Sequence, residues 1–322
     1  AAYNTAVGAQ ALGLNTTGAQ NAAVGAIALD ANTTGAGNTA MGYGALSAVT
    51  TESNNTAVGR NTLLVSTGAD NTAIGSAALA ANTTGTLNTA VGYISLDANT
   101  TGNYNTGLGY GALSAATTAA NNTAVGANAL YVTTTGANNT AVGKSALLSN
   151  TTGSENTAVG QNALDANTTG QGNTCMGQSS LSANTTGGTN VAIGVDALNA
   201  NTTASNNVAV GKSALAANTT GANNTALGKS ALYTNTGSGD NTAIGFQALY
   251  TSAGARNTAL GHNALFNNTT ADNNVAVGKD ALEANTTGTQ NVAVGTYALD
   301  ANTTSSNSTA MGYAVLTTST GA

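Results

Sequence analysis

The side chains that most often carry catalysis are scarce and scattered in this sequence of 322 residues. A general base or a nucleophile needs polar partners that converge on it in a pocket. His262 is the only histidine and Cys175 the only cysteine, and neither belongs to a recognisable catalytic motif. We interpret His262 as a surface substitution and Cys175 as a packed small residue in place of alanine. The sequence therefore predicts no enzyme activity and no cofactor.

Charged residues are also sparse, at 6% of the chain with a net charge of −6. The acidic residues stand singly and lack the Gly-Gly-x-Gly-x-Asp spacing of calcium-binding solenoids. An acidic protein is unlikely to bind nucleic acid, because binding to the phosphate backbone needs a basic surface. No apolar run is long enough to cross a membrane. We therefore predict no metal site, no nucleic-acid partner and no membrane insertion in this segment.

One edge of the molecule should nevertheless collect cations and aromatic rings. A five-residue phrase, Asn-Thr-Ala-Val-Gly, recurs along the chain, and many of these residues directly follow its glycine. They form a candidate surface-contact stripe, because tyrosine offers contact area with a polar tip, and a glycan is the candidate ligand. A solvated edge that keeps the protein soluble is the alternative interpretation. The stripe consists of Tyr43, Arg60, Tyr93, Tyr110, Lys144, Lys212, Lys229, Lys279 and Tyr313.

The elements that must position this stripe are repeats. The closing glycine of the phrase recurs from Gly8 to Gly312 at a nearly constant interval of about 17 residues. Two intervals, Gly59 to Gly75 and Gly245 to Gly261, are shorter by a single position. A fixed period of this kind is typical of a solenoid, in which each coil packs on the next. We predict a single continuous repeat array over residues 1–322 and expect it to be an excerpt of a longer fibrous protein.

Numbering the repeat from the Asn of the phrase separates fixed positions from free ones. Positions 1, 5 and 9 are Asn, Gly and Leu with one exception, position 3 is small, and position 4 is always aliphatic. Position 12 is usually Asn, followed by Thr-Thr-Gly, whereas positions 6, 7, 10, 16 and 17 vary freely. The fixed positions should form structural ladders, represented by Asn4, Val7, Gly8, Leu12, Asn156, Val159, Gly160, Leu164, Asn190, Ile193, Gly194 and Leu198.

These patterns predict a β-solenoid, or parallel β-roll, of 19 coils with about 17 residues in each coil. Positions 1 to 5 are typical of a short strand, and positions 8 to 11 indicate either a helical turn or a strand-like one. We expect the aliphatic residue at position 4 and Leu at position 9 to form apolar ladders inside. Asn at positions 1 and 12 should form amide ladders, as in stacked β structures.

The outward face of the strand should then carry Asn, Ala and Gly from positions 1, 3 and 5. A stripe of such small residues favours close packing against another chain, and hence self-association as a homotrimer or a filament. The alternative is that the alanine at position 3 points inward beside a tight turn.

The phrase, especially Asn190 to Gly194 and Asn207 to Gly211, resembles the head repeats of trimeric autotransporter adhesins, the YadA-like family. It is also similar to repeats of phage tail fibres. The resemblance implies a parallel β-roll, three chains about one axis, and a role in attachment or as a spacer.

Three functions remain open at this point. The first is a structural and adhesive fibre shaft on a cell surface or virion, with a cell-surface glycan as candidate partner. The second is an ice-binding solenoid that uses rows of Thr at positions 2, 13 and 14. The third is a subunit of a self-assembling filament. All three place the protein outside the cell.

Overall fold

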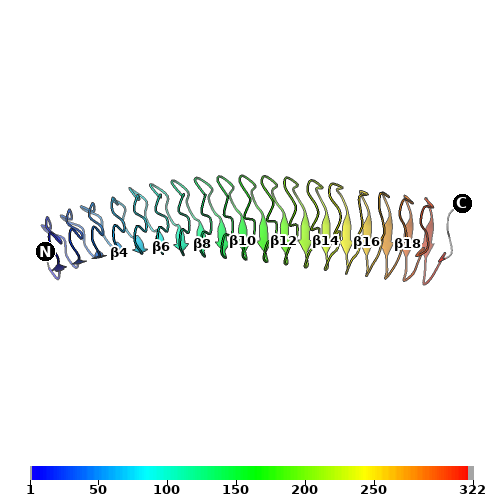
Figure 1. Ribbon diagram of the computed structural model, residues 1–322, viewed down its shortest axis with the longest axis horizontal. Helices are drawn as coiled ribbons and strands as arrows, with labels where there is room; N and C mark the ends of the chain where they lie inside the picture. Colours follow the sequence, from blue (N-terminus) through cyan, green and yellow to red (C-terminus); the bar gives the residue numbers. More distant parts are fainter. Residues whose placement is uncertain (1, 318–322) are drawn as a thin grey trace. The chain divides into compact units, whose positions relative to one another are not determined.

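The computed structural model describes residues 2–317, which form 19 short parallel strands joined by long turns, with no helix. Each coil contributes one short strand, so the predicted β-solenoid with about 17 residues per coil is confirmed (Figure 1). The strands are β1 (Thr5–Val7), β2 (Ala22–Val24), β3 (Thr39–Met41), β4 (Thr56–Val58), β5 (Thr72–Ile74), β6 (Thr89–Val91), β7 (Thr106–Leu108), β8 (Thr123–Val125), β9 (Thr140–Val142), β10 (Thr157–Val159), β11 (Thr174–Met176), β12 (Val191–Ile193), β13 (Val208–Val210), β14 (Thr225–Leu227), β15 (Thr242–Ile244), β16 (Thr258–Leu260), β17 (Val275–Val277), β18 (Val292–Val294) and β19 (Thr309–Met311).

The chain divides into two compact units, Ala1–Asn156 and Thr157–Ala322. The first unit contains β1 to β9 and the second β10 to β19, and within each unit consecutive strands pair in parallel. Equivalent repeat positions lie opposite one another, as in the pair Val275 and Val292. This register builds the ladders that the repeat predicts.

The side chains of each strand point in the opposite directions to those predicted: position 3 points inward and position 4 points outward. Alanine at position 3 is buried from the second coil onward, for example Ala276 at 0% exposure. The aliphatic residues at position 4, including Val7, Val159 and Ile193 of the expected inner ladder, are exposed or half-buried on the outer face. The prediction of an aliphatic ladder inside at position 4 is therefore wrong, and the alternative of an inward alanine is correct. Leu at position 9 does fill the interior, as Leu164 and Leu198 show.

Position 5 requires glycine for two reasons: the backbone has a positive φ there, and the next coil leaves no space for a Cβ atom. Gly278 has φ of 133°, a region that residues with a side chain rarely adopt. A Cβ atom placed on Gly278 would lie 2.6 Å from the carbonyl oxygen of Gly295 in the next coil. The coils therefore stack backbone against backbone at this corner.

The turn after the strand is not helical. In the coil that begins at Asn274, the N–H of Asp280 donates to His262 of the preceding coil at 2.9 Å. The N–H of Leu282 donates in the other direction, to Ala298 of the following coil at 3.0 Å. Positions 8 to 11 thus form neither a helix nor a second strand, but a turn that is hydrogen-bonded to both neighbouring coils. Asp280 and Leu282 make this possible by adopting positive φ values of 54° and 52°.

Both predicted amide ladders are present, and they meet at one carbonyl oxygen. At position 1, the side-chain Oδ1 of Asn257 accepts the N–H of Asn274 at 2.9 Å. At position 12, the Nδ2 group of Asn285 donates to Oδ1 of Asn268 at 3.1 Å. The Nδ2 groups of Asn274 and Asn285 also donate to the carbonyl of Gly288, at 2.9 and 3.0 Å. Each coil is therefore tied to its neighbour and closed on itself by the same side chains.

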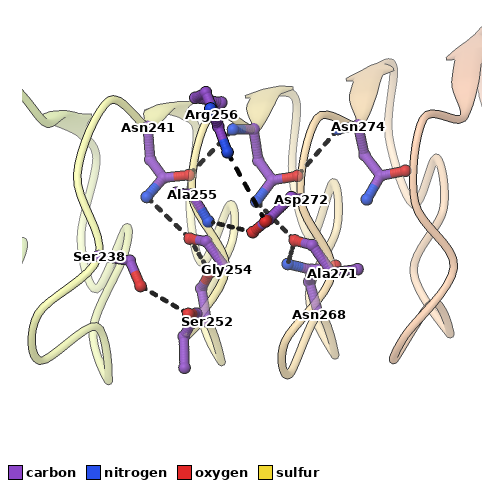
Figure 2. Close-up of polar contacts among 12 residues, drawn as sticks. Ser238, Asn241, Ser252, Gly254, Ala255, Arg256, Asn268, Ala271, Asp272 and Asn274 are labelled. Atoms are coloured by element: carbon purple, nitrogen blue, oxygen red, sulfur yellow. Dashed lines mark hydrogen bonds and ion pairs between the residues drawn. The ribbon is translucent and has the colours of Figure 1, made fainter.

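The two coils that are one position shorter share a substitution that fits their tighter turn. Position 12 is Ser66 in one and Ser252 in the other, in place of the usual Asn. The hydroxyl of Ser66 accepts Nδ2 of Asn82 at 3.1 Å, so the polar ladder reaches Ser66 from the following coil. The ladder stops there, because the preceding coil carries Val49 at position 12. In the second short coil, the side chain of Asn241 donates to Gly254 at 3.0 Å, as position 1 does elsewhere (Figure 2).

The coil before the first short one carries a compensating carboxylate. Glu52 replaces the glycine of position 15, and its Oε2 accepts the backbone N–H groups of Thr50 and Thr51, both at 3.0 Å. In a typical coil these N–H groups donate to the next turn, as Thr286 and Thr287 do to Thr303. Glu52 therefore satisfies donors beside a turn that lacks one residue.

Candidate functional surfaces

The described residues 2–317 contain no cluster of three or more His, Cys, Asp or Glu side chains that could hold a metal ion. Cys175 is fully buried, and burial raises the pKa of its thiol above the ordinary value. His262 is exposed, and its Nδ1 lies 3.5 Å from Oδ1 of Asp280. Within the same residues no helix has the length and apolar character to cross a membrane. Surfaces are therefore the candidate sites.

The predicted stripe at position 6 lies on an exposed edge in both units. Its cationic members are all exposed, and Tyr43, Tyr93 and Tyr110 each keep 54% of their surface. Tyr93 and Tyr110 come from consecutive coils, and their ring centroids lie 5.9 Å apart in a stacked arrangement. Stacking along the axis covers part of each ring face and leaves the ring edges and hydroxyls for contact.

In the second unit the stripe includes two residues that the sequence analysis did not assign to it. Phe246 and His262 also occupy position 6, and their rings stack with centroids 5.3 Å apart. Lys229 lies 5.6 Å from the Phe246 ring centroid, an arrangement typical of a cation–π contact. The repeat period alone places both residues at position 6, so the sequence could have assigned them to the stripe.

Lys279 is the best-connected cation of the stripe. Its Nζ lies 2.7 Å from Oδ2 of Asp280, donates to the Tyr297 hydroxyl at 2.9 Å, and sits 4.8 Å from the Tyr297 ring centroid. The hydrogen bond to Asp280, followed by that to Tyr297, raises the pKa of the Lys279 ammonium. The Lys279 ammonium group is therefore held by its two neighbours while the side chain remains exposed.

A second aromatic row follows position 10 and was missed by the sequence analysis. Tyr233, Tyr250 and Phe266 come from three consecutive coils. Tyr233 stacks on Tyr250 with centroids 5.2 Å apart, and Tyr250 on Phe266 at 5.1 Å, with rings within 10° of parallel. The sequence pattern that would predict this row is weak, because most coils carry a small or acidic residue at position 10.

The outer face of the sheet is the most regular surface. It presents Thr or Val from position 2 beside the aliphatic residue of position 4, one pair per coil, with Ala22 as the exception at position 2. No charged residue occupies either position in any of the 19 coils. Met41, Leu108 and Leu227 each leave 45–46% of their surface exposed on this face. A row of exposed aliphatic side chains without charges is unusual for a surface in contact with water.

Threonine rows behave differently on the two sides of the coil. At position 13 the hydroxyls donate to the next coil, as Thr286 does to the carbonyl of Thr303 at 2.9 Å. At position 2, no threonine hydroxyl within residues 2–317 has a hydrogen-bond partner in the protein. Within residues 2–317 the threonines of position 14 also lack a hydroxyl partner, except Thr51, which donates to Glu52. The rows at positions 2 and 14 therefore offer free hydroxyls, and only the row at position 2 lies on the outer face of the sheet.

The geometry defines a repeat protein of the parallel β-solenoid class. No family model matches the chain, and no curated protein is similar enough to match it.

Proposed function

We propose that the chain is the repetitive shaft of an extracellular structural or adhesive fibre, in which copies of the chain associate through the outer face of the sheet. One observation carries this proposal: the exposed row at position 4 is aliphatic in all 19 coils. The free positions accept Lys, Glu, Asp and Gln, so a face kept solely for contact with water would be expected to accept them too.

A second copy is the occupant that fits this face best. Coils follow one another at about 4.8 Å, the spacing of paired strands. Two copies therefore present rows of the same spacing and chemistry, and contact at one coil repeats at the next. Three chains is the stoichiometry that the resemblance to trimeric adhesin repeats implies. The small-residue stripe first expected to mediate this association lies inside the coil at Ala276 and its equivalents.

The test is the solution mass of the intact chain by light scattering. We expect a discrete oligomer, with three chains as the leading stoichiometry. Lysine at position 4 in three consecutive coils, Ile193→Lys, Val210→Lys and Leu227→Lys, should reduce the mass to that of one chain. The circular dichroism spectrum of this triple variant should match that of the wild-type chain.

The matched control places three lysines at position 6 of three consecutive coils, as Gln161→Lys, Gln178→Lys and Val195→Lys. Position 6 already carries lysine in four coils, so this variant should remain oligomeric. A wild-type chain that stays monomeric at high concentration would refute association through this face. Indefinite fibres by negative stain would instead favour the self-assembling filament.

Ice binding is the second candidate, and the free hydroxyls of position 2 favour it. In the first unit seven consecutive strands, from Thr39 to Thr140, place threonine at this position. The row competes for the same face as the fibre interface, so a monomer with thermal hysteresis supports ice binding. An oligomer with no hysteresis supports the fibre. The row at position 13 is less suited to ice, because its hydroxyls already donate to carbonyls such as Thr303.

A further inference from the structure

The aromatic row at position 10 ends abruptly at Tyr233. One face of this ring is stacked on Tyr250, with 10° between the ring planes. The preceding coil carries Ala216 at the same position, so no ring is stacked on the opposite face. A surface notch of about 290 Å³ opens there, lined by Asp196, Asn199, Ser213, Ala216, Ala217 and Tyr233.

The notch has the dimensions of one missing ring. Asn199 and Tyr233 occupy position 10 two coils apart, with Ala216 between them. Two coil spacings are about 9.6 Å, and contact distances to each wall leave a slot about one ring thick. Where the row is complete, Tyr250 fills the equivalent place with rings at 5.2 and 5.1 Å on its two sides.

The side walls of the notch are polar. Asp196 and Ser213 both come from position 7, with φ values of 57° and 55°. Neither their carboxylate nor their hydroxyl has a side-chain hydrogen bond within residues 2–317. The amide of Asn199 is fixed because its Nδ2 donates to the carbonyl of Ser179 at 3.1 Å and to Oγ of Ser182 at 2.9 Å. Its Oδ1 remains available as an acceptor.

This combination selects a particular ligand chemistry. An open aromatic face favours C–H groups, whereas the carboxylate of Asp196 and the amide oxygen of Asn199 accept hydrogen bonds from hydroxyls. A pyranose ring has an apolar C–H face and a rim of hydroxyls, and it is one ring thick. Pockets that fix a ligand typically combine an apolar wall with a few such polar groups.

We propose that this notch binds one hexopyranose unit of a glycan, with its C–H face on Tyr233 and its hydroxyls on Asp196 and Asn199. The site deepens the proposed fibre function and rests on it for exposure to extracellular glycans. It is distinct from the stripe at position 6, because the notch is formed by positions 7, 10 and 11.

Saturation-transfer NMR on the intact chain tests the proposal, with methyl glycosides of glucose, galactose and N-acetylglucosamine as probes at about 10 mM, a range suited to weak single-sugar binding. We expect at least one probe to bind. Tyr233→Ala should weaken binding about tenfold, the loss expected for one aromatic face. Tyr233→Phe should retain binding, since the ring face is unchanged.

Ala216→Tyr is the sharpest variant, because it extends the aromatic row into the slot without removing a polar group. Position 10 already accepts tyrosine at Tyr131, Tyr233 and Tyr250, and alanine at Ala80, so these variants should fold. We expect Ala216→Tyr to abolish binding. The matched control Tyr131→Ala removes a position-10 ring in the other unit and should leave binding unchanged.

Three results would overturn the site: no transfer from any sugar to the wild-type chain, unchanged binding in Ala216→Tyr, or binding of tetramethylammonium alone, which would assign the notch to cations. The solution mass is measured independently. An oligomer that binds no sugar would therefore refute the notch and keep the fibre, whereas a monomer that binds sugar would do the reverse.

Discussion

The side chain of Asn285 donates to Oδ1 of Asn268, one coil away, at 3.1 Å. Both residues are fully buried. The same Nδ2 group also donates to the carbonyl of Gly288 within its own coil, at 3.0 Å. One amide thus joins two coils and closes a turn, which explains why a polar residue is retained in the interior at this position.

Replacing Asn285 with valine should destabilise the coils around it. The substitution leaves Oδ1 of Asn268 without its donor and removes one of the two donors to the carbonyl of Gly288. A buried group that loses its partner costs about 1–3 kcal/mol. Hydrogen exchange of peptides from this region measures the local opening free energy, which is more suitable than one global unfolding value for a long array.

The control is Asn267→Ala, one residue before the ladder. Asn267 is exposed at position 11, where alanine is the commonest residue, so we expect no measurable change. Equal effects of the two substitutions would show that the amide ladder contributes nothing specific.

Two glycines of one coil should differ in their tolerance of alanine, because only Gly278 has a positive φ. Gly278→Ala combines a φ of 133° with a Cβ atom 2.6 Å from the carbonyl oxygen of Gly295. We expect a loss of about 3 kcal/mol or more in local stability. A Cβ atom on Gly288 would also crowd a backbone oxygen of the next coil, that of Ser305, but Gly288 does not need a positive φ. Gly288→Ala should therefore be milder, as the natural alanines of position 15, Ala119, Ala204 and Ala271, indicate. Hydrogen exchange of peptides from this coil compares the two variants, and equal opening free energies would show that the positive φ at position 5 adds nothing to the cost.

The orientation of the strand predicts a second pair of opposite outcomes. Ala276→Val adds two methyl groups in the filled interior and should cost about 1–3 kcal/mol. Thr258→Val changes the outer face, where four coils already carry valine, and should stay within about 0.5 kcal/mol. Hydrogen exchange of the amides in β16 and β17 measures the change in local stability for both variants. A harmless valine at Ala276 would mean that position 3 faces outward after all.

Glu52 should make the first unit sensitive to acid. Burial alone would raise the pKa of its carboxyl, but the hydrogen bonds from Thr51 and Thr50 outweigh burial, and the pKa lies below the ordinary value of 4.5. The folded state therefore favours the charged form. This contribution to stability is fully present above about pH 4.5 and is lost as the pH falls through the lowered pKa.

The measurement is the difference in thermal midpoint between wild type and Glu52→Gln as the pH falls from 7 to 3. The difference is needed because burial raises the pKa values of Asp165 and Glu283, and such groups stabilise the fold as the pH falls. We expect the wild-type advantage to shrink in acid. A difference that stays constant with pH would refute a charged Glu52 in the folded chain.

The sequence was sufficient for the period, the strand and both amide ladders, because each depends on one residue type repeated at one position. It could not decide which strand face is buried, since both faces are nearly invariant and alternation has the same period for either choice. The interior is filled by leucine at position 9, as at Leu282, so that only a small residue is accommodated opposite, as at Ala276 and Cys175.

The turn was ambiguous for a different reason. Its apolar spacing matches a helix, but residues such as Leu282 adopt positive φ, which the identity of leucine does not reveal. A signal did exist at position 7, where Asn61, Gly44 and Gly111 are residues that favour this conformation. The notch at Tyr233 could not be predicted, because it depends on where a row of rings stops.

The hydrogen bonds that join each turn to the neighbouring coils have a mechanical consequence. Since Asp280 is bonded to the preceding coil and Leu282 to the following one, a coil cannot lengthen without breaking its hydrogen bonds to both neighbours. A chain pulled at its ends should therefore yield in discrete steps, each releasing one coil. At about 3.4 Å per extended residue, a coil of about 17 residues contributes a step of about 58 Å in contour length. The array would act as a series of small extensible links that absorb load one at a time.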